Sequence, residues 1–426
     1  MVSSAKTDLT IASLHPKKKA PKKQYNTRNK GGDAASYRGN RGGGRGGRGS
    51  RAGRGGGYGR GRGGNQNKRY ESFLDLIPLS PPYIPHDSLV GGRIQYFVSG
   101  RSQITDDPWI LKSSKDGLAI DFISVPYFTD IPSQIKMSSE MENVCAKEVD
   151  DLLAKGAITE ISDGSSGFVS SYFCVAKSDG GFRPITNLKG LNFFIAFEIF
   201  KMERLGTVRE LLRQDDWVAK IDLKDAYLTV PMNPSFHPFL RFMWKGRIFQ
   251  YKCILLVFPP SPRYFTKLLK VVAAYLRGRG IRLVIYLDDI LLMNESKDGL
   301  LRDIDVTISL LQSLGFLINW KKSVVVPSQE QEYLGVIWRT NSLSCFLPSR
   351  KVETIRSHCS SLLEQKRVKL CNLAAILGSF TWASSAVPYA QAHFRCLQSL
   401  YIRESSRCEG DLSVFCTLSD EARSSS

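Results

Sequence analysis

Two adjacent acids, Asp288 and Asp289, interrupt an apolar stretch and separate the runs 283–285 and 290–292. Two β-prone runs that meet at a short polar interruption predict a β-hairpin with both carboxylates at its turn. The hydrophobic flanks of such a turn would partly shield the carboxylates from water, which favours a site for a metal ion. An ordinary exposed turn is the alternative, because aspartate is a common turn residue.

A third acid favours the metal site. Asp222 follows a short apolar run that begins at Val218, and this run predicts a neighbouring strand. Magnesium takes oxygen ligands, and two such ions roughly 4 Å apart stabilise both the attacking and the leaving oxygen of a phosphoryl displacement. Three carboxylates on neighbouring strands therefore predict a two-metal site.

The segments 286–289 (YLDD) and 222–227 (DLKDAY) together resemble the catalytic pair of motifs in reverse transcriptases. Segments similar to the fingers hairpin, the later palm motif and the primer grip occur in the family's order at 177–192, 314–323 and 333–338. The resemblance implies an α+β fold: a right-hand polymerase with fingers, palm and thumb, whose antiparallel palm sheet is covered by helices. Within the family, the amino-acid sequence of segments 92–97, 104–111 and 262–269 is most similar to that of DIRS-like retroelements, which carry a tyrosine recombinase.

The resemblance also implies roles for single residues. Asp222, Asp288, Asp289 and the carbonyl group of Leu223 would hold two Mg²⁺ ions, with Mn²⁺ as the alternative. These ions would lower the pKa of a primer 3′-hydroxyl and neutralise charge on the α-phosphate of a dNTP. Lys322 would protonate the pyrophosphate leaving group, and an exposed lysine without a role is its alternative.

Further residues match positions that contact substrate in the family. Tyr227 would exclude ribonucleotides by closing against the sugar 2′ position, although a core tyrosine would look the same in the sequence. Lys177 and Arg183, on either side of a glycine turn, would clamp the triphosphate, or make the hairpin soluble. The remaining expected contacts are Leu223, Asp225 and Ala226 to the dNTP, and Tyr333, Leu334 and Gly335 as the primer grip.

One segment departs from the family pattern. Where the family has roughly LPFGLSSAPR, residues 256–263 read LVFPPSPR, about two residues shorter and without the glycine that lets backbone approach the template base and nucleotide. Prolines supply neither the missing N–H groups nor the flexibility. This departure keeps open a second interpretation, a catalytically defective relic that acts at most as an RNA-binding protein.

The basic charge of the chain is concentrated at its start. The net charge is +19, and residues 1–70 carry 18 Lys or Arg against two acids, together with 17 of the 36 glycines. Such a segment lacks the apolar surface needed to offset the entropy of ordering, which predicts disorder. Arginines spaced by glycine predict a sequence-tolerant RNA-binding arm, with a solubilising linker as the alternative; they are Arg41, Arg45, Arg48, Arg51, Arg54, Arg60 and Arg62.

The sequence therefore predicts a basic tail (1–70), a lead-in (71–135), fingers and palm (136–345), a helical thumb or connection (346–402) and a polar tail (403–426). Capping boxes at Ser139 and Thr207 predict the starts of two helices, and helical spacing predicts others at 265–276, 299–314 and from 349. No apolar run reaches the roughly 20 residues of a membrane span, and the nine cysteines lack zinc-site spacing.

These features together predict an RNA-directed DNA polymerase of a retrotransposon. Its partners would be an RNA template, a DNA primer and dNTPs, without a membrane, and the sequence gives no oligomeric state. We expect an intracellular protein, cytoplasmic or nuclear, with a lysine cluster at 17–23 as a candidate import signal. A polymerase that copies only DNA is disfavoured by the basic tail and by the YLDD segment.

Overall fold

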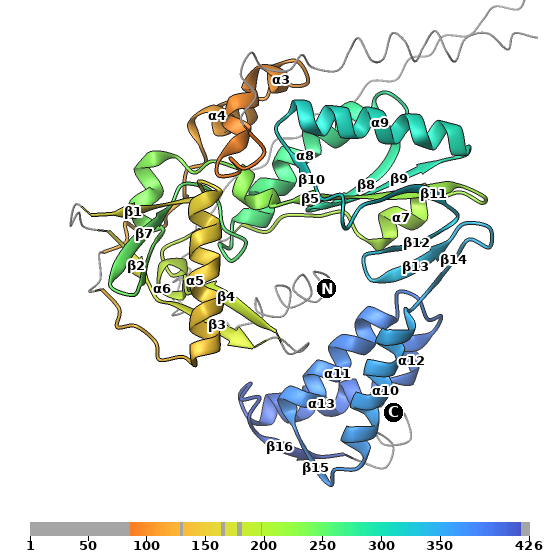
Figure 1. Cartoon of the computed structure of the whole chain (residues 1–426). Helices are drawn as coiled ribbons and strands as arrows, with labels where there is room; N and C mark the ends of the chain where they lie inside the picture. The colour runs from red at the N-terminus through yellow and green to blue at the C-terminus, as the bar shows by residue number, and fades with distance from the viewer. Residues whose placement is uncertain (1–85, 128–130, 163–166, 177–180, 197, 419–426) are drawn as a thin grey trace, which may run out of the picture. The chain divides into compact units, whose positions relative to one another are not determined.

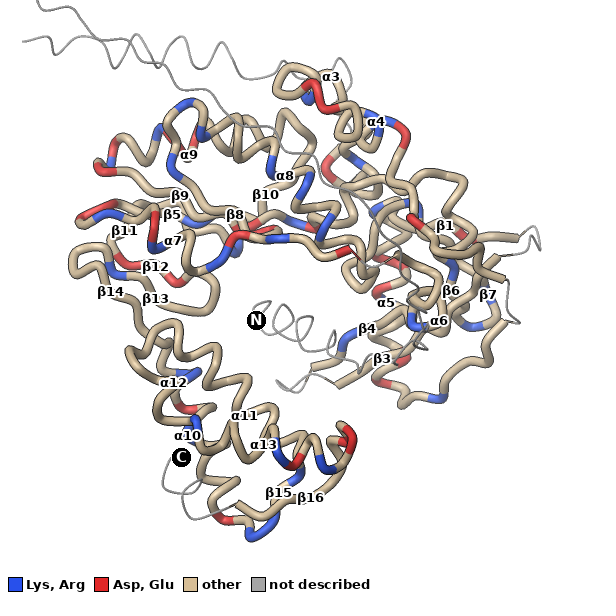
Figure 2. The backbone as a smooth tube through the Cα atoms, turned by 180° about the vertical axis from the view of Figure 1, so that it is seen from behind, with Lys and Arg blue, Asp and Glu red and all other residues tan. Residues whose placement is uncertain are grey.

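The computed structural model describes residues 86–127, 131–162, 167–176, 181–196 and 198–418. The chain divides into two units, 1–72 and 73–426, and every described residue belongs to the second. The predicted disorder of 1–70 and its arginine-glycine arm thus lie outside the described residues. Figure 2 shows acidic and basic positions intermixed over the described elements, as expected when most of the net charge lies in the first 70 residues.

The centre of the second unit is an antiparallel sheet with the order β10-β5-β9-β8, in which β11 also pairs with β5. Helices α8 and α9 cover one face (Figure 1), while α7 and the β12–β13 hairpin pack on the other through one hydrophobic cluster. This two-sided cover explains why β9 is buried at almost every position, since neither face of the strand meets water. The elements are β5 (Trp217–Lys224), β8 (Arg282–Tyr286), β9 (Asp289–Asn294), β10 (Leu317–Ile318), β11 (Val324–Ser328), β12 (Glu330–Tyr333), β13 (Val336–Arg339), α7 (Leu205–Leu211), α8 (Ser261–Arg277) and α9 (Lys297–Ser313).

The predicted helices are present, but two of their caps are wrong. The first long helix, α5 (Ser139–Ala154), is capped by Ser138, whose hydroxyl accepts a hydrogen bond from the Met141 N–H at 3.3 Å. Ser139 is already inside the helix, because two serines stand in a row and only the first has an extended backbone. Helix α7 begins before Thr207, whose hydroxyl accepts from the Arg204 N–H at 3.3 Å.

The fingers contain a four-stranded sheet and a separate hairpin beside α5 (Figure 1). Strand β2 pairs in parallel with β6, and β3 pairs with β4 to form the hairpin. The hairpin thus forms as predicted. The elements are β1 (Ile158–Ile161), β2 (Val169–Ser170), β3 (Tyr172–Ala176), β4 (Phe182–Thr186), α6 (Lys189–Asn192), β6 (Arg241–Trp244) and β7 (Arg247–Tyr251).

The lead-in contains three short helices among its described residues. It forms η1 (Arg93–Phe97), α3 (Val98–Ser102) and α4 (Pro108–Asp116). Arg101 is buried, and its guanidinium donates to the Leu314 carbonyl oxygen at 2.8 Å and lies over the Phe316 ring. The lead-in is therefore attached to the end of α9.

The segment after the palm has a hydrophobic core of its own. Helix α10 begins at Ser349, but Pro348 is its N-cap, so Ser349 is not a cap. The predicted polar tail contains an element that we did not expect, a strand at 415–417 whose Cys416 is buried in this core. The elements are α10 (Ser349–Leu363), β15 (Arg367–Lys369), α11 (Leu370–Ala383), α12 (Ala390–His393), α13 (Arg395–Arg407) and β16 (Phe415–Thr417), after the short strand β14 (Ser344–Phe346).

None of the described helices combines the length and the apolar character that crossing a membrane requires.

Candidate active site

Asp222 lies near the end of β5 and is held by two residues that follow β10. Its backbone N–H donates to the Ser323 hydroxyl at 3.0 Å, and its carbonyl oxygen accepts from the Asn319 N–H at 2.8 Å. The Asn319 side-chain amide also donates to the carboxylate, at 2.9 Å. The residue is 3% exposed, so both the direction and the hydration of this carboxylate are restricted.

The other two acids lie on the predicted hairpin. Strands β8 and β9 are joined by a turn of Leu287 and Asp288, and Leu287 has a φ of 54°. A branched residue rarely adopts this left-handed conformation, which costs on the order of 1–3 kcal/mol and is concentrated at functional sites. Asp288 is thus at the tip, as predicted, whereas Asp289 is the first residue of β9.

Sheet register brings these acids to Asp222. Asp222 is directly opposite Asp289 in the β5–β9 ladder, and the Leu223 N–H donates to the Asp288 carbonyl oxygen at 2.9 Å. Burial, and then the charges of Asp288 and Asp289, raise the pKa of Asp222 to about 6. The fold therefore brings Asp222 and Asp288 close together.

The third carboxylate is engaged differently. Asp289 forms an ion pair with Lys220, with 3.1 Å between Nζ and Oδ1. Among the described residues, no group of three or more His, Cys, Asp or Glu is assembled as a metal site. The predicted three-carboxylate cluster is thus not preformed: Asp222 and Asp288 form the centre, and Asp289 is held by a lysine.

Lys322 lies close enough to Asp222 for its charge to oppose the rise in the pKa of that carboxyl. It is exposed and lies within the turn that Asn319 begins, where the Lys322 N–H donates to the Asn319 carbonyl oxygen at 3.1 Å. The position predicted to carry a general acid is therefore at the edge of the acidic site.

Asp225 and Tyr227 continue the chain after β5. Asp225 has a φ of 49°, and its carboxylate accepts from the Lys155 ammonium group at 3.0 Å. Ala226 and Tyr227 begin the short helix η2 (Ala226–Thr229), and the Tyr227 ring contacts Phe265 with 5.0 Å between centroids. The Tyr227 hydroxyl is buried and has no hydrogen-bond partner among the described residues, and burial, followed by the charge of Asp288, raises its pKa.

The predicted primer grip is a tight turn. Leu334 and Gly335 join β12 to β13, with φ values of 52° and 83°. Positive φ at both positions is typical of the turn that matches strand twist. Tyr333, the residue before the turn, is fully buried, and its hydroxyl lies 3.2 Å from the Val284 carbonyl oxygen and 3.1 Å from that of Asp289.

The two predicted triphosphate cations are on the fingers hairpin. Lys177 lies outside the described residues. Arg183 is half-buried on β4, opposite Val175. Among the described contacts none joins Arg183 to the palm acids, so its role in binding a triphosphate stays a prediction.

Residues 256–263 depart from the family pattern in a different way from the one predicted. Counted back from Arg263, the ten-position family pattern begins at Ile254, so the segment is not shorter and Val257 occupies the position of the glycine. The prolines lie elsewhere, because Pro260 is the N-cap of α8 and Pro262 is in its first turn, where proline is favoured. Val257 is 37% exposed, and its side chain is the true departure from the pattern.

Sequence reasoning missed four residues that support the site: Lys220, Ser323, Asn319 and Lys155. A signal existed for Lys220, because side chains two positions apart on one strand point to the same face. Ser323 and Asn319 lie in segments that resemble a palm motif, but the resemblance gave them no role. The contact between Lys155 and Asp225 joins positions 70 residues apart, and nothing local in the sequence indicated it.

Comparison with known families agrees with this geometry. Residues 175–338 match the family described as "Reverse transcriptase (RNA-dependent DNA polymerase)". The matched segment includes β4 of the fingers hairpin, Asp222, the β8–β9 turn and the primer-grip turn. Residues 175–338 are therefore similar to a reverse transcriptase domain.

Curated relatives are viral polyproteins. The chain is 26% identical over 212 residues to the genome polyprotein of Petunia vein clearing virus (isolate Shepherd), which covers 49% of this chain and 9% of the relative. It is 24% identical to the enzymatic polyprotein of Soybean chlorotic mottle virus, over 48% of this chain and 29% of the relative. It is also 24% identical to the Pol polyprotein of Equine infectious anemia virus (strain Wyoming), over 57% of this chain and 21% of the relative. The chain thus spans less than a third of the length of these relatives.

Solved structures with the same fold include two foamy viral protease-reverse transcriptases. One, in complex with dsDNA, has a TM-score of 0.53 at 20% identity and covers 75% of this chain and 68% of that chain. Another, the dRH form in complex with dsDNA, has a TM-score of 0.57 at 19% identity and covers 82% of this chain and 61% of that chain. The fold is the predicted right-hand polymerase with antiparallel sheets and helices.

Proposed function

We propose that this chain is an RNA-directed DNA polymerase that adds dNTPs to a primer 3′-hydroxyl on an RNA or DNA template. The observation that carries the proposal is the register of β5 and β9, which places Asp222 opposite Asp289 and beside the Asp288 turn. This arrangement stands inside the segment that matches the reverse transcriptase family. This placement of the acids supports the proposed nucleotidyl transfer.

The residues present fit a divalent cation. Burial, and then the charges of Asp288 and Asp289, raise the pKa of Asp222, so a cation at this point would stabilise a charged carboxylate in a poorly hydrated place. All the candidate donors are oxygen atoms, which suits Mg²⁺ or Mn²⁺. Asp222 and Asp288 would hold the ions, and Asp289 would join after leaving Lys220. Bound ions would polarise the reacting oxygens and neutralise phosphate charge.

The protein groups around the acids would position the substrate. Tyr227 is fixed by its contact with Phe265, so its ring would form a rigid wall beside the sugar of a bound nucleotide. Lys322, exposed near Asp222, would offer a proton or a positive charge to the leaving pyrophosphate. Lys177 and Arg183 would contact the triphosphate from the fingers hairpin.

The proposed partners are a template strand and its primer. Solved neighbours of similar fold include a foamy viral protease-reverse transcriptase in complex with an RNA/DNA hybrid and one with dsDNA. The basic segment 1–70 would add sequence-tolerant contacts to phosphates and bases. We also propose a DIRS-like retrotransposon as the source, because the amino-acid sequence of segments 92–97, 104–111 and 262–269 resembles that group.

The competing proposal, a defective relic that only binds RNA, is supported by Val257 at the glycine position. Primer extension separates the two. The full chain, an oligo(dT) primer on poly(rA), dTTP and Mg²⁺ should give extended product, and Asp288→Asn should lower the rate on the order of 10²–10³-fold, as loss of a preorganised charge-stabilising group does. The exposed helical acid Asp305 provides the control, since Asp305→Asn should leave the rate unchanged. No extension by the unmodified chain would favour the relic, and extension that survives Asp288→Asn would remove the site assignment.

A further inference from the structure

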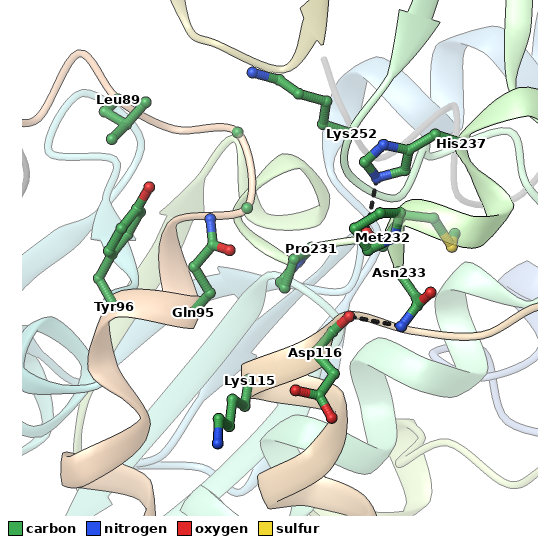
Figure 3. A pocket seen from close by; sticks show the side chains of 13 residues that line it. Leu89, Gln95, Tyr96, Lys115, Asp116, Pro231, Met232, Asn233, His237 and Lys252 are labelled. Carbon is green, nitrogen blue, oxygen red and sulfur yellow. Dashed lines mark hydrogen bonds between the residues drawn. The ribbon is translucent and has the colours of Figure 1, made fainter.

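A second concave site lies between the lead-in and the chain that follows η2. It is a pocket of about 520 Å³, lined by residues 89–96 and 115–116 of the lead-in on one side and by residues 231–237 and Lys252 on the other (Figure 3). This volume is within the usual range for sites that hold a small molecule or one unit of a polymer. The lead-in residues are outside the segment that matches the reverse transcriptase family, so the family match does not account for the pocket.

The pocket has a rigid floor. Pro231 and Met232 are buried, and the chain there is bonded on both sides: the Leu118 N–H donates to the Pro231 carbonyl oxygen, and the Met232 N–H donates to that of Lys252, both at 2.9 Å. Gly92 has a φ of 68°, and a Cβ atom there would come within 3.3 Å of Pro231 Cβ. The glycine thus lets the lead-in backbone approach the floor closely.

The wall of the pocket carries an aromatic ring and an amide. Tyr96 is 40% exposed, and Figure 3 shows it beside Gln95 on one side of the pocket. An exposed tyrosine ring provides a stacking surface for a nucleobase of any identity. The neighbouring Gln95 amide can both donate to and accept from the edge of a base.

The charges of the pocket favour an anion in two places. Lys252 and Lys115 are at opposite edges, above and below the Tyr96–Gln95 wall in Figure 3, and neither ammonium group has an ion-pair partner among the described residues. Asp116 is the one acid among the lining residues. Burial lowers the pKa of His237, and its Nε2 atom lies 2.8 Å from the Met232 carbonyl oxygen.

We infer that this pocket binds single-stranded nucleic acid, with one base against Tyr96 and Gln95 and the flanking phosphates at Lys252 and Lys115. Cations at opposite edges of the pocket suit a strand with several phosphates better than the single phosphate cluster of a free nucleotide. A basic track with an aromatic platform is how proteins hold single strands without reading their sequence. The Gly92 N–H donates to the carbonyl oxygen of Leu228, the residue after Tyr227, at 2.8 Å. The pocket wall is therefore bonded directly to the segment that carries Tyr227.

Photo-crosslinking tests the site in the full chain. The protein carries Asp288→Asn, so binding is measured without turnover, and the probe is an oligo(dT) with one 5-iododeoxyuridine. We expect an adduct on the peptide that contains Tyr96. Lys115→Gln and Lys252→Gln should each lower its yield at least about threefold and reduce the salt slope of binding by about 0.7, the value for one lost phosphate contact on a single strand.

The controls separate this site from the basic tail and from the polymerase proposal. Lys112→Gln, on the same helix as Lys115 but outside the pocket lining, should change neither value, and adducts on Tyr37 and Tyr58 of the tail should be unaffected by all three substitutions. Thermal unfolding at an unchanged temperature would show that each variant is folded. Three results would overturn the inference. They are no adduct on Tyr96, an adduct yield that neither pocket substitution changes, and competition by millimolar dTMP that equals competition by unlabelled oligo(dT). Because no step requires catalysis, a failed primer-extension assay would leave this result intact.

Discussion

The hydroxyl group of Tyr333 lies 3.1 Å from the carbonyl oxygen of Asp289. This contact joins the primer-grip hairpin to the hairpin that carries the acids, through a side chain that is fully buried. The same hydroxyl is 3.2 Å from the Val284 carbonyl oxygen on β8, so it reaches both strands of the acidic hairpin. The position of Asp288 at the turn is thus coupled to the β12–β13 turn, where a primer end would rest.

Tyr333→Phe removes this connection while keeping the ring. We expect a loss of about 1 kcal/mol in the free energy of unfolding, because one buried hydrogen bond disappears and little volume changes. Chemical denaturation of the two forms measures the difference. Tyr389→Phe is the control, since Tyr389 is 88% exposed and its substitution should change nothing. Equal stability of Tyr333→Phe and the unmodified chain would mean that the hydroxyl does not hold the two hairpins together.

Much of this arrangement could be predicted because its signals are local. Leu268, Val272 and Leu276 recur at helical spacing and are buried on α8 as expected. The apolar runs on both sides of Asp288 similarly define the β8–β9 hairpin. Each of these predictions depends on a stretch of a few turns or a few strand residues, within which periodicity is informative.

The remaining features depend on contacts that periodicity does not encode. The ion pair of Lys220 with Asp289 requires the β5–β9 register, and this register joins strands more than 60 residues apart. The strand at 415–417 forms only because β15 is available as its partner. The cap of α5 was misplaced by one residue because Ser138 and Ser139 have the same side chain, and only backbone conformation separates them.

Asp222→Asn should stabilise the metal-free chain. The pKa of Asp222 is raised from 3.8 to about 6 in the folded state, so the folded chain binds this proton more tightly than the unfolded chain, and stability falls as pH rises from about 4 to about 6. At pH 7 the charged carboxylate costs on the order of 2 kcal/mol, which asparagine avoids. Denaturation with EDTA at pH 4 and pH 7 should show a gain at pH 7 that disappears at pH 4. Asp289→Asn should give no such gain, because it breaks the ion pair with Lys220; a gain of equal size there would contradict the account.

Tyr227→Val should admit ribonucleotides. The Tyr227 ring is fixed against Phe265, and replacing it with a smaller side chain opens space where a 2′-hydroxyl would lie. We expect the preference for dTTP over UTP, measured as a ratio of kcat/KM values, to fall on the order of 10–100-fold, the usual effect of a steric contact in a pocket. Tyr227→Phe keeps the ring and should keep the preference. It should also cost no stability, because the hydroxyl that it removes has no partner. An unchanged preference in Tyr227→Val would show that the ring does not face the sugar.

Val257→Gly should raise polymerase activity. Val257 occupies the position of the family glycine, inside the turn 255–258 in which the Phe258 N–H donates to the Leu255 carbonyl oxygen at 3.2 Å. A branched side chain there keeps the backbone away from a template base or nucleotide, and glycine removes that barrier. We expect at least about a tenfold gain in kcat/KM for dTTP, corresponding to roughly 1.4 kcal/mol of better transition-state binding. Val257→Ala is the matched control, because it retains a Cβ atom and should recover only part of the gain. If Val257→Gly extends primers no faster than the unmodified chain, the valine is not what limits this polymerase, and the difference must lie in how the fingers hairpin meets the triphosphate.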